Sequence, residues 1–444
     1  MTFAEAYRYL AKLKKIPRRE YLLDPALCVV YLERLQKLLD LLGNPEKKIP
    51  HYIHIAGTSG KGSTGLMLES IWRKAGHRTG LLLSPGVDGL IAHALVNGQP
   101  LRPTALTRLV TKIKSALDYY QKNKLGDVPS TFEIFTALTL LHFAEKKVEW
   151  AILEVGLGGR YDSTNVIPYK DIAIVTNIGF DHTELLGRTR AKIAVEKAGI
   201  IKAGSRVFTA EEHPAALRVI ERECQQEQAP LKKISSNNYQ LKKISFGQLS
   251  FVYQKKIYHL PTFAEHQIKN ALLAIEAAKA IHIPQSTIKK GLAFVRLPIR
   301  LELTQRRPAI ILDGAHNPDK MQATVAAIKM LRHDGIIKPT ANIHLVVGFA
   351  ADKNWTTMLR QLAGLKPRSI ACARFTKNTS RAVAEPAEIA RRFETLLPGA
   401  TVRSFSQPKA ALAWSRRQQK TSDLLLVTGS MYLSGEVRLL FFAK

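Results

Sequence analysis

A glycine-rich stretch between an expected strand and an expected helix limits the fold of this chain more than any other feature. From His54 to Thr64 the sequence reads His-Ile-Ala-Gly-Thr-Ser-Gly-Lys-Gly-Ser-Thr, and helical spacing then continues to Ala75. Glycines let backbone N–H groups point inward, a helix N-terminus adds positive potential, and a lysine neutralises phosphate charge. The stretch therefore predicts a phosphate-binding loop, which fits this order of strand, loop, lysine and helix better than an ordinary glycine-rich turn does.

The predicted loop departs from the strict GxxxxGK[ST] pattern, because Ile55 occupies the first glycine position and Gly62 separates Lys61 from Ser63. We expect Lys61 to act on the β- and γ-phosphates of a nucleotide and the Ser63 hydroxyl to reach a magnesium ion. Contacts to the nucleotide are expected along the whole segment, from Gly57, Thr58, Ser59, Gly60, Lys61, Gly62 and Ser63.

Short apolar or β-branched runs alternate with amphipathic stretches, which is typical of an α/β fold with largely parallel sheets. At 444 residues the chain exceeds what one hydrophobic core usually supports, so we predict two domains, residues 1–296 and 297–444. Between Ser205 and Ala264, polar pairs and strand-like segments such as Gln248–Tyr253 predict a hairpin insertion or an edge region. The expected strands are Tyr52–Ala56, Thr79–Leu83, Trp150–Val155, Asp171–Ile178, Ala309–Leu312, Ile343–Val347 and Leu424–Val427.

The composition, with 46% hydrophobic and 23% charged residues, is that of a globular protein. No apolar run is long enough to span a bilayer and the N-terminus lacks the pattern of a secretory signal, so we expect a cytoplasmic protein with no membrane partner. The three cysteines, Cys28, Cys224 and Cys372, lie far apart without a CxxC pair, which argues against disulfides and zinc sites.

The formal net charge of +30 is extreme for a chain of this size. Its lysines and arginines are spread in short pairs such as Lys232-Lys233 and Lys255-Lys256, without the interleaved aromatic residues of a nucleic-acid groove. We therefore expect a solvated basic surface that attracts anionic small substrates, and nucleic acid is not an expected partner. A nucleic-acid-associated ATPase is the alternative from another functional class, and it predicts ATP turnover stimulated by DNA or RNA.

A second motif follows the strand expected at Trp150–Val155. Gly156 and Gly158 begin a GxGxxG match, but Tyr161 stands where the third glycine belongs, which weakens a dinucleotide interpretation. Glu154 ends the expected strand, and a carboxylate there, near a phosphate loop, is placed to hold the magnesium of a nucleotide. A salt-bridged surface role for Glu154 is an equal alternative.

Two further segments carry polar side chains directly after expected strands. Asp181 and His182 lie in a run from Asn177 to Gly187 that is dense in possible ligands. Asp181 is equally a candidate helix cap, and a lone histidine such as His182 is more often structural than catalytic. Asp313 and His316 belong to an Asp-Gly-Ala-His-Asn-Pro segment, a loop position typical of α/β binding sites. An Asx turn that caps the next helix is the alternative for Asp313.

Taken together, these motifs resemble the Mur ligase superfamily, and within it the folylpolyglutamate synthase and dihydrofolate synthase family, over nearly the whole chain. The resemblance implies a P-loop-type central domain with a parallel-rich sheet and a smaller Rossmann-like C-terminal domain. The residues that carry it are Gly57–Ser63, Ser84-Pro85, Phe132-Glu133, Leu153–Asn165, Asp181–Gly187, Glu196–Ile200, His266-Gln267 with Asn270, Arg300–Glu302, Asp313–Pro318 and Thr428–Ser430.

Roles for single residues also follow from the resemblance. It implies that Asn270, Arg300 and Asp313 bind ATP, and that Lys197 is carbamylated and acts in catalysis with Lys61 and His182. The implied magnesium ligands are Ser63, Ser84, Glu154 and His182. The implied substrate contacts are Phe132, Glu133, Tyr161, Asp162 and His316.

The activity implied by the resemblance is ATP- and magnesium-dependent addition of L-glutamate to folate or dihydropteroate through an acyl phosphate, by a monomer. The chain departs from the family at Gly86, where a histidine is usual, and at Ala92-His93-Ala94, where Glu-Arg-Ile is usual. A further departure is Ile299, where the family has a glycine before Arg300. A Mur-like ligase with another carboxylate substrate is therefore the alternative within the same class.

Overall fold

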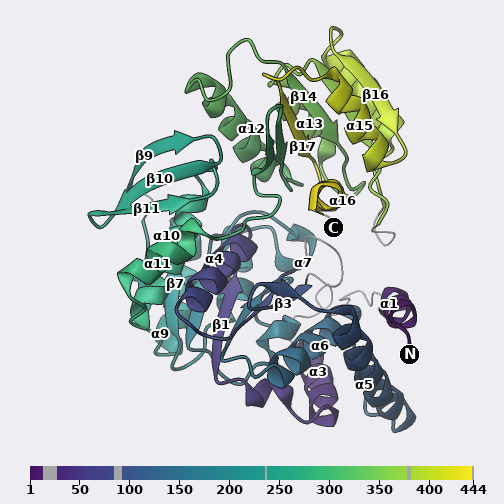
Figure 1. Cartoon of the computed structure of the whole chain (residues 1–444). Coiled ribbons are helices and arrows are strands. Elements are labelled where there is room, and N and C mark those ends of the chain that lie inside the picture. The colour runs from purple at the N-terminus through teal and green to yellow at the C-terminus, as the bar shows by residue number, and fades with distance from the viewer. Residues whose placement is uncertain (14–27, 85–92, 236–237, 378–381, 443–444) are drawn as a thin grey trace. The chain divides into compact units, whose positions relative to one another are not determined.

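The computed structural model describes residues 1–13, 28–84, 93–235, 238–377 and 382–442, and it divides into two compact units (Figure 1). The first unit contains most of the chain up to Tyr239 together with Lys269–Val295. The second contains Gln240–Ile268 and the chain from Arg296 onward. Both units are of the α/β class with parallel-rich sheets, which confirms the predicted fold class.

An eight-stranded sheet forms the centre of the first unit, in the order β4-β3-β2-β5-β1-β6-β7-β8. Strands β2, β5, β1, β6, β7 and β8 run parallel, and β3 and β4 are antiparallel additions at one edge. The central strands are almost wholly buried apolar runs, as expected of parallel strands covered on both faces. The bounds are β1 His51–Ala56, β2 Thr79–Leu82, β3 Ala94–Val96, β4 Gln99–Pro100, β5 Trp150–Glu154, β6 Ile172–Val175, β7 Arg206–Thr209 and β8 Leu231–Lys233.

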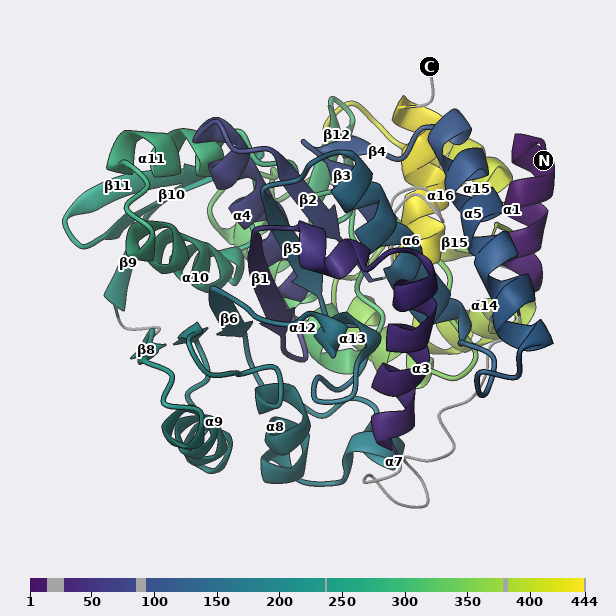
Figure 2. The same ribbon diagram turned by 90° about the horizontal axis from the view of Figure 1, so that it is seen from below.

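Helices cover both faces of this sheet. One face packs against α1, α3, α5 and α6 near β2 and β5, and against α8 and α9 near β6 and β7. On the opposite face, α4 begins directly after the predicted phosphate loop, and α11 packs along it (Figure 2). The bounds are α1 Phe3–Lys12, α3 Val29–Leu41, η2 Pro45–Lys48, α4 Lys61–Lys74, α5 Pro103–Lys122, α6 Thr131–Glu145, η4 Ser163–Val166, α7 Thr183–Leu186, α8 Arg190–Ala198, α9 Pro214–Gln226, α10 Gln267–Ala280 and α11 Gln285–Ala293.

The second unit has a six-stranded sheet in the order β12-β13-β17-β14-β15-β16, in which only the edge strand β12 is antiparallel to its neighbour. Helices α12, α13 and α14 pack on one face, and α15 and α16 pack on the other. The bounds are β12 Glu302–Arg306, β13 Ala309–Leu312, α12 Pro318–His333, β14 Ile343–Val347, α13 Trp355–Ala363, β15 Ser369–Ala373, α14 Pro386–Leu396, β16 Thr401–Phe405, α15 Pro408–Gln418, β17 Leu424–Thr428 and α16 Met431–Phe442.

A separate three-stranded antiparallel sheet, β9 Tyr239–Ser245, β10 Gln248–Tyr253 and β11 Lys256–Leu260, belongs largely to the second unit. The prediction of a hairpin insertion or an edge region between Ser205 and Ala264 is right for this sheet and for β8, the edge strand of the eight-stranded sheet, and wrong for β7 and α9. There, β7 continues the parallel sheet and α9 buries Ala216, Ile220 and Cys224. One of the polar pairs, Lys232-Lys233, lies exposed in β8.

Among the residues that the structure describes, no helix is long and apolar enough to cross a membrane.

Candidate active site

The loop between β1 and α4 contains two glycines in tightly packed positions. Any other residue at either position would displace a neighbouring side chain. Gly57 has φ +144°, and a Cβ atom there would lie 1.8 Å from Thr176 Oγ1. Gly60 caps α4 with φ +86°, and a Cβ atom there would lie 2.2 Å from Asn270 Oδ1. The loop is therefore closely packed, and Asn270, predicted to bind the nucleotide, lies directly against it.

The segment after β6 supports this loop from the other side. The Thr58 N–H donates to Asn177 O at 2.8 Å, and the Ser59 N–H donates to the Asn177 side chain, also at 2.8 Å. The Gly179 N–H donates to Thr58 Oγ1 at 2.9 Å. These bonds fix the backbone of the loop before any ligand arrives.

Two lysine side chains converge on one carbonyl group of the loop. Lys61 Nζ donates to Gly57 O at 2.9 Å, and Lys197 Nζ, from the C-terminal turn of α8, donates to the same oxygen at 3.1 Å. Burial lowers the pKa of Lys197 to about 7, and the nearby charge of Lys61 contributes to this shift. Lys61 supplies positive charge for an anion at this loop, and Lys197 is readily available as the neutral amine.

Oxygen ligands gather at the end of β5, beside the start of α4. Glu154 is the last residue of β5, its side chain is buried, and its Oε2 accepts the Ser84 N–H at 3.0 Å. A Cβ atom at Gly62 would lie 3.1 Å from the same oxygen, so this carboxylate lies against the first turn of α4, which also contains Ser63. Carboxylate and hydroxyl oxygens are the ligands that Mg²⁺ prefers, so these residues fit the ion.

Within the described ranges, no three His, Cys, Asp or Glu side chains group closely enough to hold a metal by themselves. A magnesium ion near Glu154 would therefore depend on hydroxyl, water and phosphate oxygens as well. His182, the remaining predicted ligand, directly precedes α7 as its N-cap in the left-handed conformation, with Nδ1 3.7 Å from Glu184 Oε1. Its role as a ligand stays a prediction.

The segment from Gly156 to Asn165 folds back on itself over the end of β5. Asp162 is fully buried, and its carboxylate accepts the N–H groups of Leu157 at 2.9 Å and Thr164 at 3.0 Å. A Cβ atom at Gly156 would lie 2.6 Å from Phe132 Cε1, so the Phe132 ring lies against this segment. Phe132, Tyr161 and Asp162, three of the predicted substrate contacts, thus belong to one packed region of the first unit.

Glu133 is the N3 residue of α6 and forms a capping box with Ser130. Its carboxylate also accepts a bidentate pair of hydrogen bonds from Arg34 of α3, at 2.9 Å from Nε and 2.8 Å from Nη2. Both side chains are buried. The polar capacity of the Glu133 carboxylate is therefore already used to fix the start of α6, and through it the position of Phe132.

In the second unit, Asp313 follows β13 and fixes the polypeptide around it. Its side chain accepts the N–H groups of Leu301 at 3.0 Å and Ala315 at 2.9 Å, and the Thr324 hydroxyl at 2.7 Å. The bond to Ala315 is the Asx turn that the sequence offered as an alternative. Ile299, on one side of Arg300, has φ +49°, a conformation that explains the glycine usual at this position in the family.

His316 is half-buried after the same strand, with Nδ1 2.8 Å from Gly314 O and Nε2 3.2 Å from Lys320 Nζ. Burial lowers the pKa of His316 to about 3, and the charges of Lys320, Lys353 and Arg300 lower it further. The imidazole is therefore neutral and lies among cationic groups, an arrangement suited to anionic ligands.

Several residues of these sites had no role assigned from sequence. Arg34 lies 99 positions from Glu133, and no local pattern indicates the pair. Asn177 and Gly179 belong to a run that the sequence singled out, but for Asp181 and His182 rather than for support of the phosphate loop. Gly86 and Ala92, where the chain departs from the family, lie outside the described residues.

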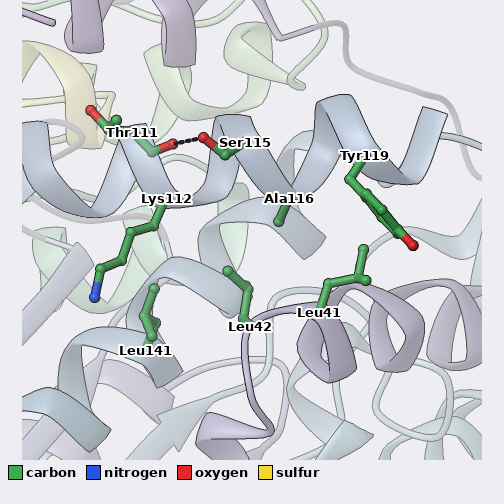
Figure 3. Close-up of a pocket in the computed structure, with 8 residues that line it drawn as sticks. All are labelled: Leu41, Leu42, Thr111, Lys112, Ser115, Ala116, Tyr119 and Leu141. Carbon is green, nitrogen blue, oxygen red and sulfur yellow. Dashed lines mark hydrogen bonds between the residues drawn. The ribbon is translucent and has the colours of Figure 1, made fainter. Parts of the chain in front are cut away.

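A cavity of about 560 Å³ lies away from these groups, on the helices α3, α5 and α6 (Figure 3). Leu41, Leu42, Ala116, Tyr119 and Leu141 give it a largely apolar lining, and Thr111 accepts the Ser115 hydroxyl along one wall. It contains none of the predicted site residues.

Comparison with known proteins supports the same regions. The Mur ligase middle domain family matches residues 55–278, and the Mur ligase glutamate ligase domain family matches residues 299–431. The dihydrofolate synthase/folylpolyglutamate synthase of Bacillus subtilis is 33% identical over 426 residues, which cover 92% of this chain and 94% of the relative.

Two solved structures are similar over the whole length. Escherichia coli FolC in complex with DHPP and ADP has a TM-score of 0.80 and 28% identity, and the match covers 100% of this chain and 98% of the other. Folylpolyglutamate synthase of Mycobacterium tuberculosis, complexed with ADP and AMPPCP, has a TM-score of 0.83 and 26% identity, with coverage of 99% and 98%.

Proposed function

Because the chain belongs to the folylpolyglutamate synthase and dihydrofolate synthase family of Mur ligases, we propose that it joins L-glutamate to dihydropteroate, to tetrahydrofolate, or to both. Membership of this family makes it an ATP-dependent ligase, as the motifs predicted. The carboxylate of the pterin substrate attacks the γ-phosphorus of ATP, and ADP leaves. The glutamate amine then attacks the acyl phosphate, and phosphate leaves as the amide forms.

The observation that best supports this chemistry is the convergence of Lys61 and Lys197 on Gly57 O, at 2.9 and 3.1 Å. Phosphoryl transfer is accelerated chiefly by fixed positive charge around the transferred group, and Lys61 supplies such a charge at the loop. Lys197, with a pKa of about 7, has the neutral amine that reaction with carbon dioxide requires. A carbamate there would place an anion beside Lys61.

For magnesium, we assign Glu154, Ser63 and Ser84, with His182 as the predicted fourth ligand. The buried carboxylate of Glu154 beside Gly62 and Ser84 supports this assignment. When bound, the ion neutralises charge that develops on the phosphate oxygens. The residues of the chain act together with it by holding the phosphates: Thr58 to Lys61 through the loop backbone, and Asn270 through its position against Gly60.

For the two organic substrates, we assign separate regions of the chain. Phe132, Tyr161 and Asp162, with Glu133 behind them, are assigned to the pterin-bearing carboxylate, because they form one packed region in the first unit. His316 is assigned to L-glutamate, because Lys320 and Lys353 near it offer charge complementary to glutamate carboxylates. Arg300 and Asp313 are assigned to the nucleotide, as the resemblance implies.

Phosphate release from ATP tests the proposal. The purified chain is given ATP, magnesium, L-glutamate and either dihydropteroate or tetrahydrofolate, and each component is omitted in turn. Release that requires all components, with a product one glutamate heavier by mass spectrometry, supports the proposal. Release with glutamate and a carboxylate other than a folate indicates the Mur-like alternative, and release stimulated by DNA or RNA indicates the ATPase alternative.

A further inference from the structure

We propose that His54 is a positioning residue: it ties the strand of the phosphate loop to the segment Gly156–Asn165, which carries the assigned pterin contacts, and so sets substrate affinity. The inference rests on the proposed function for the identity of that substrate. His54 lies in β1, three residues before Gly57, and its side chain is fully buried.

A chain of three hydrogen bonds begins at His54 and continues within this segment. His54 Nε2 lies 2.7 Å from Thr164 Oγ1, and the Thr164 hydroxyl donates to Asp162 Oδ1 at 2.6 Å. Asp162 Oδ2 accepts the Leu157 N–H at 2.9 Å. The chain of bonds thus runs from β1, through Thr164 and Asp162, to the backbone directly after Gly156.

The hydrogens available fix the direction of these bonds. The Asp162 carboxylate accepts, so the single hydroxyl hydrogen of Thr164 goes to it. Thr164 Oγ1 must then accept from His54, which requires the tautomer with hydrogen on Nε2. The opposite ring nitrogen, Nδ1, is then a bare acceptor, and it is buried with no hydrogen-bond partner among the described residues.

The surroundings of the ring keep it in this neutral state. Burial lowers the pKa of His54 well below its usual range, and the charges of Lys170 and Lys202 lower it further. Lys170 is itself bonded to the segment, since its Nζ donates to Asn165 Oδ1 at 2.6 Å. A cationic imidazole would have no partner for its second hydrogen at Nδ1.

The far end of the segment is fixed independently of His54. The Asn165 side chain donates to Arg160 O at 2.8 Å and to Gly199 O at 3.2 Å, and the Arg160 N–H donates to Glu196 O at 2.8 Å. These bonds join Arg160 and Asn165 to the end of α8, beside Lys197. Loss of the His54 bond would therefore loosen Thr164 and Asp162, and leave Arg160 and Asn165 in place on the Lys197 side.

The phosphate loop also has its own support, from Asn177 and Gly179. Removal of the His54 donor should consequently affect the two substrates unequally. The KM for the pterin carboxylate should rise, whereas kcat and the KM for ATP should change little, because the loop and its lysines keep their positions.

Two substitutions at one position test this. In His54→Leu the donor to Thr164 is lost, and we expect the KM for the pterin carboxylate to rise about tenfold, with kcat and the KM for ATP within about threefold. In His54→Gln the side-chain amide can donate to Thr164 as Nε2 does, so most of the increase in KM should disappear. The matched control is His344→Leu in the second unit, another buried histidine that bonds to a hydroxyl and a carboxylate. It should lower the melting temperature without a change in either KM.

Equal increases in both KM values for His54→Leu, or a lowered melting temperature with neither KM changed, would overturn the proposal. Nitrogen-15 NMR of the histidines provides a readout that needs no activity. We expect the His54 ring to carry its hydrogen on Nε2 and not to titrate between about pH 5 and 8. If the wild type releases no phosphate with either pterin carboxylate, the proposed function fails, and the NMR result alone decides the arrangement: hydrogen on Nδ1, or titration in that range, overturns it.

Discussion

Each unit of this protein contains a buried histidine bonded to a hydroxyl group, in a network that ends on an aspartate, and the two networks differ in where they lie on their sheets. In the first unit, His54 bonds to Thr164, which bonds to Asp162, over the C-terminal ends of the parallel strands. In the second, His344 lies 2.7 Å from Ser369 Oγ and 3.2 Å from Asp423 Oδ2. Ser369 begins β15 and Asp423 directly precedes β17, so this network lies at the N-terminal ends of the strands.

The difference shows that residue types alone do not identify a functional site. Binding sites in open α/β sheets lie outside the carboxyl ends of the strands, where loops are free to vary. The three residues of the second network are of the types found in serine hydrolases, but they are almost wholly buried and fix strand starts. We therefore expect substitutions at the C-terminal ends to change kinetics and those at the N-terminal ends to change stability.

The largest expected effect at the C-terminal ends is that of Lys61→Ala. Loss of a fixed charge beside the transferred phosphoryl group should lower kcat/KM by about 10²–10³-fold, measured by phosphate release under saturating glutamate. Lys74→Ala, at the exposed end of the same helix, is the control and should leave kcat/KM unchanged. A similar loss of kcat/KM in both variants would mean that the reaction depends on the total charge of α4 and not on Lys61 in particular.

Lys197→Ala should lower kcat about 10²-fold, with partial recovery on addition of short carboxylic acids that replace a carbamate. In the wild type, activity should depend on pH, because the pKa of Lys197 is about 7. The amine is protonated below this pKa and neutral above it, and only the neutral form reacts with carbon dioxide. Activity at fixed carbon dioxide should therefore rise as the pH rises through 7.

Measurement in buffers freed of carbon dioxide and then resupplied with bicarbonate checks the carbamate directly. The wild type should lose activity and regain it, whereas Lys197→Ala should respond only to the added carboxylic acids. Full activity of the alanine variant would exclude any part for Lys197 in the reaction.

The bounds of several strands could be predicted from sequence, because an apolar run is a local signal. The strands Ala309–Leu312 and Ile343–Val347 have the bounds expected from their apolar runs. The expected strand Asp171–Ile178 was too long, since β6 ends at Val175 and the following residues turn to support the phosphate loop. The helix after the loop begins at Lys61 rather than Thr64, because Gly60 in the left-handed conformation already caps it.

Contacts between distant positions could not be predicted in the same way. Nothing near Glu133 in the sequence indicates Arg34, and nothing near His54 indicates Thr164, 110 positions later. Glu133 and Asp162 were predicted as substrate contacts from resemblance, but their carboxylates also have structural partners that only the fold reveals. The type of a residue thus limits the interactions that its side chain can make, and the fold determines which partners lie close enough to make them.

At the N-terminal ends of the second sheet, Asp423→Asn should destabilise the protein by about 2 kcal/mol without a change in KM. Burial alone would raise the pKa of Asp423, but the N–H groups of Lys420 and Asn342 and the His344 ring lower it overall. Since its pKa in the folded state lies below that of the unfolded chain, the stabilisation is present above the unfolded pKa and lost as pH falls through the folded one. Urea unfolding of wild type and variant from pH 7 down to about pH 3 checks this: the difference between them should shrink with acid.

Removal of one hydroxyl group from each histidine network should have the smallest effects on stability and kinetics. It also allows the closest comparison of the two networks. Ser369→Ala should cost about 1 kcal/mol of stability, since it removes one hydrogen bond to His344, and should leave both KM values unchanged. Thr164→Val should cost a similar amount but also raise the KM for the pterin carboxylate, because the bond it breaks leads to Asp162 and Leu157. Urea unfolding and steady-state kinetics on the two variants measure both quantities. If Thr164→Val changes stability alone, the two networks are equivalent, and the position of a histidine network on its sheet says nothing about function here.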